Sequence, residues 1–544
     1  TFNQPLNNWD VSNVTEMQGM FANATFFNQS LGNWDVSNVL DMRSMFYTAK
    51  SFDRDISSWD FNQNVEIIDF LNNCGLSTSN YDLLLEAFNN KNLVDKDLGA
   101  VSVAYCDEST RNSLVNNKNF MIKGDVLGQC GTTFNPSTIP FVTTWTVQQG
   151  ELDIEVFTIQ AYNYDFTVDW GDGQIDQNVN ADITHTYSSA GTYTVSITGV
   201  FPYFKTCNIS NGFNINCNNS TKLTSVESWG NQEWRYMLGS FNSAENFNLN
   251  ATQPPNLTNV RSLRDTFREA EIFQQNINNW DVSNVTDMSG TFYGATSFDQ
   301  PLNNWDVSNV KDMSDMFSFA ESFNQPLNNW DVSNVKDMSD MFGVAEEFNQ
   351  PIDNWDVSKV KDMDNMFAYA ESFNQSINNW NVSNVIDMRS MFDGAIAFNK
   401  SLNDWDVSNV TDMGDMFYYA TSFNQPLSNW DVSNVTNMVY MFNDANSFNQ
   451  PLNNWVVSNV TNMSGMFGYA ESFNQPLNNW DVSNVIYMNF MFNNSINFNQ
   501  DISSWCVEQI PTEPQSFATN NALQASFFPD WGATCTLGVA ENSL

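Results

Sequence analysis

Histidine is almost absent from this sequence, since His185 is the single one among 544 residues. A Ser-His-Asp or Cys-His catalytic site would have to use that residue, and a histidine-rich metal cluster is excluded. The sequence also lacks a Walker loop, a glycine fingerprint for dinucleotides and an HExxH motif. We therefore expect that the protein is not an enzyme and that His185 has a structural role.

Basic residues and long apolar runs are also scarce. Lys and Arg number 20 against 62 Asp and Glu, which gives a formal net charge of −42. Such a surface repels nucleic acid and anionic membranes, and it suits solubility, cations or a basic protein partner. Because no apolar run reaches the roughly 20 residues that a membrane helix needs, we expect no membrane-spanning segment. We expect no cofactor, with Ca²⁺ as the one candidate ion.

Cysteine is confined to the ends of the repeated regions, and no CxxC motif is present, which argues against zinc and redox sites. Proximity in the sequence suggests three disulfides, Cys106–Cys130, Cys207–Cys217 and Cys506–Cys535. This pairing leaves Cys74 as the unpaired cysteine. The alternative is that these cysteines are reduced and buried. We favour the disulfides, and with them an extracellular or cell-surface location.

Tryptophan recurs with a strict period. It stands at 280, 305, 330, 355, 380, 405, 430, 455, 480 and 505, so the repeat is 25 residues long, and Trp9, Trp34 and Trp59 keep the same spacing. A propeller blade needs about 40 residues, whereas leucine-rich repeats have 20 to 29. One such unit cannot bury its apolar face alone, but stacked units share a continuous core. The period therefore predicts a solenoid.

The apolar positions of one unit suggest how it folds. Leu302, Trp305 and Val307 belong to a stretch whose last part alternates, which is typical of a strand with Asp306 pointing outward. Apolar residues then follow at spacings of three, three, one and three, from Val310 to Ala320, which is typical of a short helix. We therefore predict an α/β solenoid of the leucine-rich-repeat type, with a parallel sheet on one face and short helices on the other.

The period also divides the chain into segments. We predict the end of a first array at 1–60, its closing cap at 61–134, a small β-sandwich at 135–205, an opening cap with irregular repeats at 206–275, the regular array at 276–505 and a C-terminal cap at 506–544. Alternating β-branched residues, as in FVTTWTV, indicate the β-sandwich. Since Thr1 falls inside a repeat, we expect the chain to be part of a longer protein.

The repeat resembles that of a known family. Its pattern V-x-x-M-x-x-M-F-x-x-A-x-x-F follows the V-x-x-I-x-x-A-F-x-x-C-x-x-L of BspA-like leucine-rich-repeat surface proteins, and the commonest unit, FNQPLNNWDVSNVTDM, looks like their 25-residue variant. DWGDG at 169–173 and HTY at 185–187 resemble a polycystic-kidney-disease (PKD) domain. The order of these parts resembles surface proteins of the Bacteroidetes type. The resemblance implies a cell-surface or secreted adhesin that binds an extracellular protein or glycan, or other chains of the same surface assembly.

The expected strands present a column of acidic residues, which we take as the candidate binding surface. Its members share the position of Asp306 in the repeat: Asp281, Asp306, Asp331, Asp356, Asp406, Asp431 and Asp481. Like charges about 5 Å apart repel each other. Salt, Asn or Ser hydrogen bonds, sparse lysines or bound Ca²⁺ would relieve the repulsion. The alternative is a solvated acidic face that binds no ion.

Two functions of different classes remain open. One is an adhesin that presents an acidic concave face, and the other is a structural spacer that holds distal domains away from the cell. N-x-S/T sequons such as those at Asn284 and Asn409 descend from one repeated motif. We expect these asparagines to hydrogen-bond neighbouring backbone.

Overall fold

The computed structural model describes residues 2–91, 93–128, 130, 136–149, 153–157, 164–206, 208–210, 214–217 and 219–534. The chain divides into two compact units, Thr1–Thr291 with Asn309–Asp312 and Phe292–Ser308 with Met313–Leu544. The described part of the chain has two α-helices, and none of its helices is long and apolar enough to cross a membrane.

Both α-helices lie in the first unit, outside the 25-residue repeats. α1 (Thr78–Asn90) directs one side to the core, through Tyr81, Leu84, Leu85 and Phe88. α2 (Glu108–Asn117) is capped at its N-terminus by Asp107, whose side chain accepts a hydrogen bond from the Thr110 N–H at 3.0 Å. Two 3-10 turns complete the helical elements that are described, η1 (Ser220–Lys222) and η2 (Ala525–Phe527).

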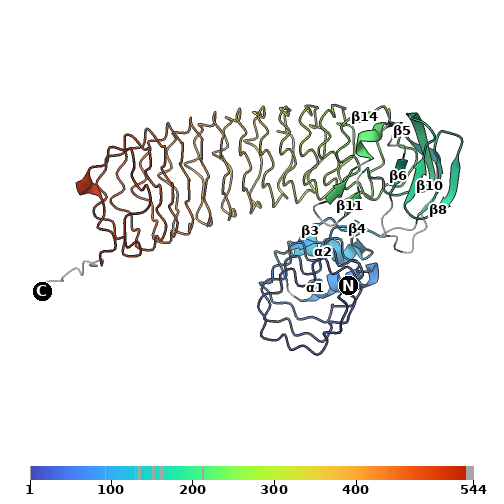
Figure 1. Cartoon of the computed structure of the whole chain (residues 1–544), viewed down its shortest axis with the longest axis horizontal. Helices are drawn as coiled ribbons and strands as arrows, with labels where there is room; N and C mark the ends of the chain where they lie inside the picture. Colours follow the sequence, from blue (N-terminus) through green and yellow to red (C-terminus); the bar gives the residue numbers. More distant parts are fainter. Residues whose placement is uncertain are drawn as a thin grey trace. The chain divides into compact units, whose positions relative to one another are not determined.

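The strands form one larger mixed sheet and several two-stranded ones (Figure 1). The larger sheet has the order β14-β13-β5-β10-β7-β8. Its strands are β5 (Ser137–Val147), β7 (Asp165–Asp169), β8 (Ile175–Val179), β10 (Gly191–Val200), β13 (Leu223–Ser228) and β14 (Asn248–Leu249). The small sheets pair β1 (Asp97–Gly99) with β3 (Met121–Lys123), β2 (Ala104–Tyr105) with β4 (Val126–Leu127), β6 (Asp153–Val156) with β9 (Ile183–Thr186), and β11 (Asn208–Ser210) with β12 (Asn214–Asn216).

The larger sheet extends beyond the segment 135–205 for which we predicted a small β-sandwich. Alternate residues of β5 are buried, including Phe141 and Trp145, as the sequence pattern indicates. However, β5 also pairs with β13, which lies beyond the expected segment, and β13 pairs in turn with β14. The sheet therefore continues into the first irregular repeat.

Each 25-residue repeat forms one coil made of successive reverse turns. In the coil 327–351 the N–H of Trp330 donates to the Leu327 carbonyl (3.0 Å), and that of Gly343 donates to Asp340 (3.0 Å). Other N–H groups between these turns donate to the next coil, as Phe342 does to the Met366 carbonyl at 2.9 Å. Successive coils of the second unit are thereby joined edge to edge (Figure 1).

The prediction of an α/β solenoid with helices on one face is wrong. The segment with helical spacing does not form a helix, because Asp340 and Val344 adopt left-handed backbone with φ of 54° and 57°. A helix would keep its N–H groups in bonds within the segment, whereas here they alternate between turn and neighbouring coil. The expected strands are also absent from the described coils of the second unit. Parallel bridges of a single residue pair join these coils at a later position of the repeat, as between Asp337 and Asp362.

The apolar positions of the repeat nevertheless form the core. The rings of Phe317 and Phe342 stack at 5.6 Å between coils, and Phe342 stacks on Phe348 at 4.0 Å within its coil. Trp355 and Trp380 stack at 6.4 Å, and each indole N–H donates to a carbonyl of the preceding coil, as Trp355 Nε1 does to Leu327 at 3.1 Å. The strict tryptophan period therefore reflects both ring stacking and a buried hydrogen bond.

Candidate binding surface

The predicted acidic column lies on an exposed turn and not on a strand. All seven members are exposed, and each carboxylate accepts a hydrogen bond from the serine two residues later. In Asp306, Oδ1 accepts from both the Ser308 N–H (3.1 Å) and its hydroxyl (2.6 Å). The equivalent hydrogen bonds, side-chain and backbone, hold the pKa values of Asp356 and Asp431 below their ordinary value. Formation of this turn accounts for the aspartates without a ligand.

Several sequon asparagines, Asn409 among them, act as we expected. Asn409 Nδ2 donates to the Ser383 carbonyl of the preceding coil at 2.7 Å, and Asn434 donates in the same way to Ser408. This ladder satisfies backbone carbonyls that the turns leave free.

Among the described residues, no group of three or more His, Cys, Asp or Glu side chains is placed to hold a metal ion. The hypothesis that Ca²⁺ bridges the column therefore stays a prediction.

His185 lies on β9 of the first unit. Its Nε2 is 3.0 Å from Asp172 Oδ2, and its ring stacks on Trp170 with centroids 4.8 Å apart. The edge of Tyr187 packs against it at 4.6 Å. These contacts bury the histidine between aromatic rings, as is usual for a residue with a packing role.

The cysteines agree with the predicted pairing where they are described. Cys106 and Cys130 form a disulfide, and Cys74 is free. Burial raises the pKa of the Cys74 thiol to about 12, so the reactive thiolate is suppressed. Cys217 and Cys506 are each disulfide-bonded, but their predicted partners, Cys207 and Cys535, lie outside the described residues.

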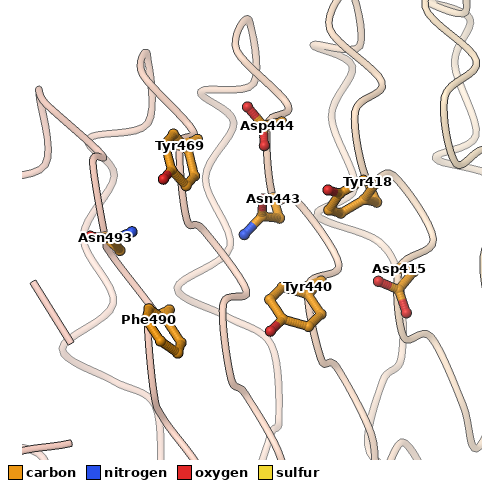
Figure 2. Close-up of a pocket in the computed structure, with 8 residues that line it drawn as sticks. All are labelled: Asp415, Tyr418, Tyr440, Asn443, Asp444, Tyr469, Phe490 and Asn493. Carbon is orange, nitrogen blue, oxygen red and sulfur yellow. The ribbon is translucent and has the colours of Figure 1, made fainter. Parts of the chain in front are cut away.

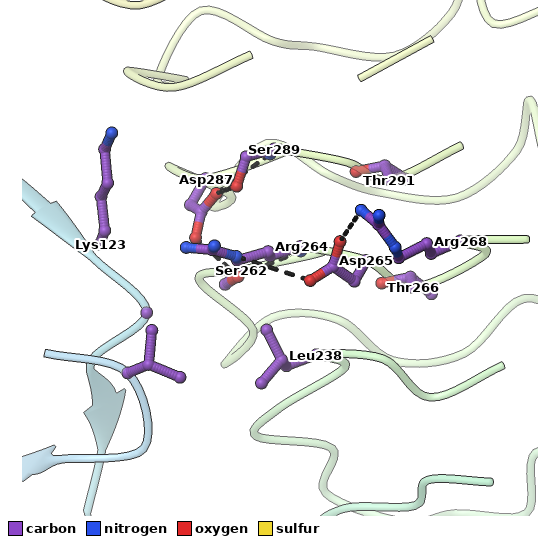
Figure 3. Close-up of polar contacts among 12 residues, drawn as sticks. Lys123, Leu238, Ser262, Arg264, Asp265, Thr266, Arg268, Asp287, Ser289 and Thr291 are labelled. Carbon is purple, nitrogen blue, oxygen red and sulfur yellow. Dashed lines mark hydrogen bonds and ion pairs between the residues drawn. The ribbon is translucent and has the colours of Figure 1, made fainter. Parts of the chain in front are cut away.

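A buried polar cluster lies in the first unit where the second series of coils begins (Figure 3). The Asp287 carboxylate accepts hydrogen bonds from the Ser262 hydroxyl (3.0 Å) and the Ser289 hydroxyl (2.7 Å). Burial, reinforced by Asp312, raises the pKa of Asp287, and the partly exposed guanidinium of Arg264 opposes the rise. Lys123 Nζ is 3.2 Å from Asp312. The charges of this cluster compensate one another, so we assign it to the core.

One turn position of the second unit exposes aromatic rings in every second coil. Phe319, Tyr369, Tyr419 and Tyr469 are spaced 50 residues apart, and their exposed fractions are 41, 42, 48 and 45%. The intervening coils have Val344, Gly394, Asp444 and Asn494 at this position. We call the four rings the aromatic column. The repeat pattern did not predict it, because the pattern treats the repeats as equivalent.

The aromatic column ends in a hollow of about 510 Å³, which four successive coils line (Figure 2). Its residues are Asp415, Tyr418, Tyr440, Asn443, Asp444, Tyr469, Phe490 and Asn493. Two glycines make room for side chains that line the hollow. A Cβ at Gly465 would lie 2.2 Å from Cδ1 of Tyr440, and one at Gly468 would lie 2.4 Å from the Asn443 amide nitrogen. The hollow is therefore a local departure from the common repeat.

The hollow is acidic as well as aromatic. Burial, and then the nearby Asp412, raises the pKa of Asp415 to about 6. Burial and Glu471 raise the pKa of Asp444. The residues that line the hollow include no lysine, arginine or histidine. A positive charge placed there would lower the electrostatic free energy of both carboxylates.

These features define a repeat protein of stacked 25-residue coils with a differentiated outer surface. A family model described as "Mycoplasma protein of unknown function, DUF285" matches residues 1–83, 235–354, 337–455 and 424–531, and the chain belongs to this family. The match does not include 84–234, so it lends no support to a PKD domain, and its description names Mycoplasma and not Bacteroidetes. No curated protein and no solved structure matches the chain.

Proposed function

We propose that this chain is a cell-surface or secreted adhesin whose second unit binds an extracellular partner through the aromatic column. The observation that carries the proposal is the exposure of four aromatic rings at one repeat position. Isolated exposed apolar residues are ordinary, but aligned aromatic rings are typical of recognition surfaces. Neighbouring coils are about 4.8 Å apart, so rings in alternate coils recur about every 10 Å and suit an extended ligand.

The backbone beneath the aromatic column favours binding because it is already ordered. The Tyr469 N–H donates to the Asn493 carbonyl (2.7 Å), and the Tyr419 N–H donates to Asn443 (2.8 Å). A partner would therefore meet rings on a fixed frame, which reduces the entropy lost on binding. The disulfide Cys106–Cys130 supports an oxidising, extracellular setting.

The acidic surface narrows the choice of partner. A net charge of −42 disfavours nucleic acid and other polyanions. An extracellular protein or a neutral glycan remains, and either class can use tyrosine rings for contact. No catalytic role is part of the proposal.

The alternative function is a spacer that holds distal domains away from the cell. The ladder of hydrogen bonds between successive coils supports it, because such a ladder resists bending. A spacer does not need exposed aromatic rings, so the aromatic column separates the two proposals.

The test uses the full chain and a variant in which Phe319, Tyr369 and Tyr419 are each replaced by Asn, the residue present at 494. Binding to host cells and to immobilised matrix proteins is measured for both, together with surface labelling of the source organism. Specific binding that the variant loses supports the adhesin. Equal binding by the two proteins, or none by either, contradicts it and leaves the spacer.

A further inference from the structure

We propose that the hollow at the end of the aromatic column binds a cationic side chain, preferably the guanidinium of arginine, from a basic segment of the partner protein. This inference rests on the proposed function, since it names the chemistry of the ligand. It concerns the hollow formed by four coils, and not the aromatic column as a whole.

The first argument is the arrangement of the aromatic rings. Tyr418 and Tyr440 lie with centroids 6.3 Å apart and planes at 83°, so they form two walls at a right angle. Tyr469 and Phe490 line the hollow from the two following coils (Figure 2). A cation within about 6 Å of a ring centroid is attracted to the face of that ring. A planar guanidinium can also stack on one tyrosine, which an ammonium cannot do.

The second argument is charge complementarity. Asp415 and Asp444 line the hollow, and within the described residues neither has an ion-pair partner. Arg389 acts on Asp415 only at longer range, because its guanidinium is paired with Asp364 at 2.5 Å. An arginine in the hollow would meet two carboxylates and several ring faces together. A neutral sugar would satisfy the rings but would leave the carboxylates uncompensated.

The third argument is shape. The volume of about 510 Å³ falls within the range of about 300–1,000 Å³ that is usual for ligand sites. The absence of a side chain at Gly465 and at Gly468 lets the Tyr440 ring and the Asn443 amide take their places in the lining of the hollow.

The right-angled pair of Tyr418 and Tyr440 also depends on residues that differ between the coils. The position of Tyr418 is occupied in the three preceding coils by Gly343, Ala368 and Asp393, and none of these has an aromatic ring. These three coils therefore cannot form the right-angled pair of tyrosines. Tyr293 occupies the position of Tyr418 earlier in the array, but the coil that follows it has Asp315 at the position of Tyr440. We therefore expect one cationic site and not a repeated series.

The test measures binding of an acetylated, amidated tetra-arginine peptide to the full chain by calorimetry at physiological ionic strength. Two variants alter the hollow, Tyr469→Asn and Asp444→Asn. Two matched controls make the same changes elsewhere. Tyr487→Asn alters a tyrosine that is 55% exposed and lies outside both the hollow and the aromatic column, where the preceding coil already has Asn462. Asp406→Asn lies on the exposed acidic turn. Melting curves establish that all four are folded, and Asn494 and Asn381 already occupy the equivalent positions.

We expect saturable binding with one strong site, tighter for tetra-arginine than for tetra-lysine. Each hollow variant should weaken it about tenfold, whereas each control should change it by less than about twofold. Equal weakening by all four variants, or absence of saturable binding, would overturn the inference, because only diffuse attraction to the acidic surface would remain.

The two proposals fail in distinguishable ways. Loss of cell binding in the triple aromatic variant, with no tetra-arginine binding at the hollow, would refute the cationic ligand and leave the adhesin intact. Binding of a neutral oligosaccharide that Tyr469→Asn abolishes and Asp444→Asn does not would also refute the cationic ligand. Tetra-arginine binding without any binding to cells or matrix would contradict the adhesin alone.

Discussion

Replacement of Asp340 by Asn should stabilise the protein at neutral and alkaline pH but not in acid. Asp340 is half-buried, and its pKa is raised to about 7 by burial and by the neighbouring charges of Asp315 and Asp364. Its backbone is left-handed, with φ of 54°, a conformation that asparagine tolerates well. The next coil already has Asn365 at the equivalent position. The substitution therefore removes an unfavourable charge and keeps the turn.

The pH range in which the substitution stabilises the protein follows from the direction of the pKa change of Asp340. Because folding raises the pKa of Asp340 from its ordinary 3.8, the folded state binds the proton more tightly than the unfolded state. The stability that this gives is fully present below about pH 4 and is lost as the pH rises to about 7. Asparagine does not titrate, so the variant does not suffer this loss.

The pKa change also sets an upper limit on the free energy of stabilisation. A rise from 3.8 to about 7 corresponds to an upper limit of about 4 kcal/mol, at ~1.4 kcal/mol for each pH unit. Partial exposure and salt reduce this value, and we expect a gain of about 1–2 kcal/mol above pH 7. For a unit of this size each kcal/mol raises the melting temperature by about 2–4 °C.

The assay is a series of thermal melts of wild type and variant between about pH 4 and pH 8.5, which spans the pKa change. The control is Asp306→Asn, at an exposed turn where Asn381 accepts the same serine hydrogen bonds. The difference in melting temperature should grow with pH for Asp340→Asn and stay flat for the control. A constant difference for Asp340→Asn, or equal profiles for the two variants, would refute the electrostatic reasoning.

Four further changes test other parts of the structure by melting temperature. Trp405→Phe leaves the Ile377 carbonyl without its buried indole donor (2.9 Å), and should destabilise by about 1–3 kcal/mol. Val344→Asn should stabilise by about 1 kcal/mol, because a β-branched residue at φ of 57° is strained; no gain would contradict the strain. Loss of the Cys106–Cys130 disulfide, which spans 24 residues, should cost about 3 kcal/mol and speed proteolysis near α2. If Ca²⁺ bridges the acidic column, EDTA should lower the melting temperature, and the double variant of Asp306→Asn with Asp331→Asn should abolish that effect. A melting temperature that is unchanged by EDTA and rises with NaCl would indicate a screened acidic face.

The sequence predicted which residues are buried better than it predicted the secondary structure. Leu302, Trp305 and Val307 are at most 3% exposed, as the repeat pattern indicated. Burial follows from the period alone, because stacked identical units must share one core. The choice between helix and turns depends instead on a few backbone dihedral angles. Gly394 and Gly465 recur at the left-handed positions, and these glycines were the available signal.

The candidate site could not be read from the common repeat. The hollow arises where four coils differ from one another, with Tyr440 packed over Gly465 and Asn443 beside Gly468. A consensus removes these differences, while it emphasises recurrent residues such as Asp306. That aspartate recurs through most of the array because its carboxylate closes a turn with Ser308. Recurrence between repeats therefore marks the scaffold, and variation at an exposed turn marks the candidate site.

Backbone strain gives an independent reason to place function on the turns. Aromatic residues of the second unit adopt left-handed backbone at six described positions: Phe319, Tyr369, Tyr419, Tyr440, Tyr469 and Phe490. Each left-handed conformation costs about 1–2 kcal/mol of stability relative to a relaxed backbone. Glycine or asparagine stands at equivalent positions in other coils, so an aromatic residue is not required to form the turn. Exposed rings such as that of Tyr419 do not recover this cost through burial in the core. Strained residues that do not stabilise their own fold are typical of functional sites. The strain agrees with the proposed contact between these aromatic residues and a partner. The aspartates of the acidic column need no such explanation, because they close turns of their own coil.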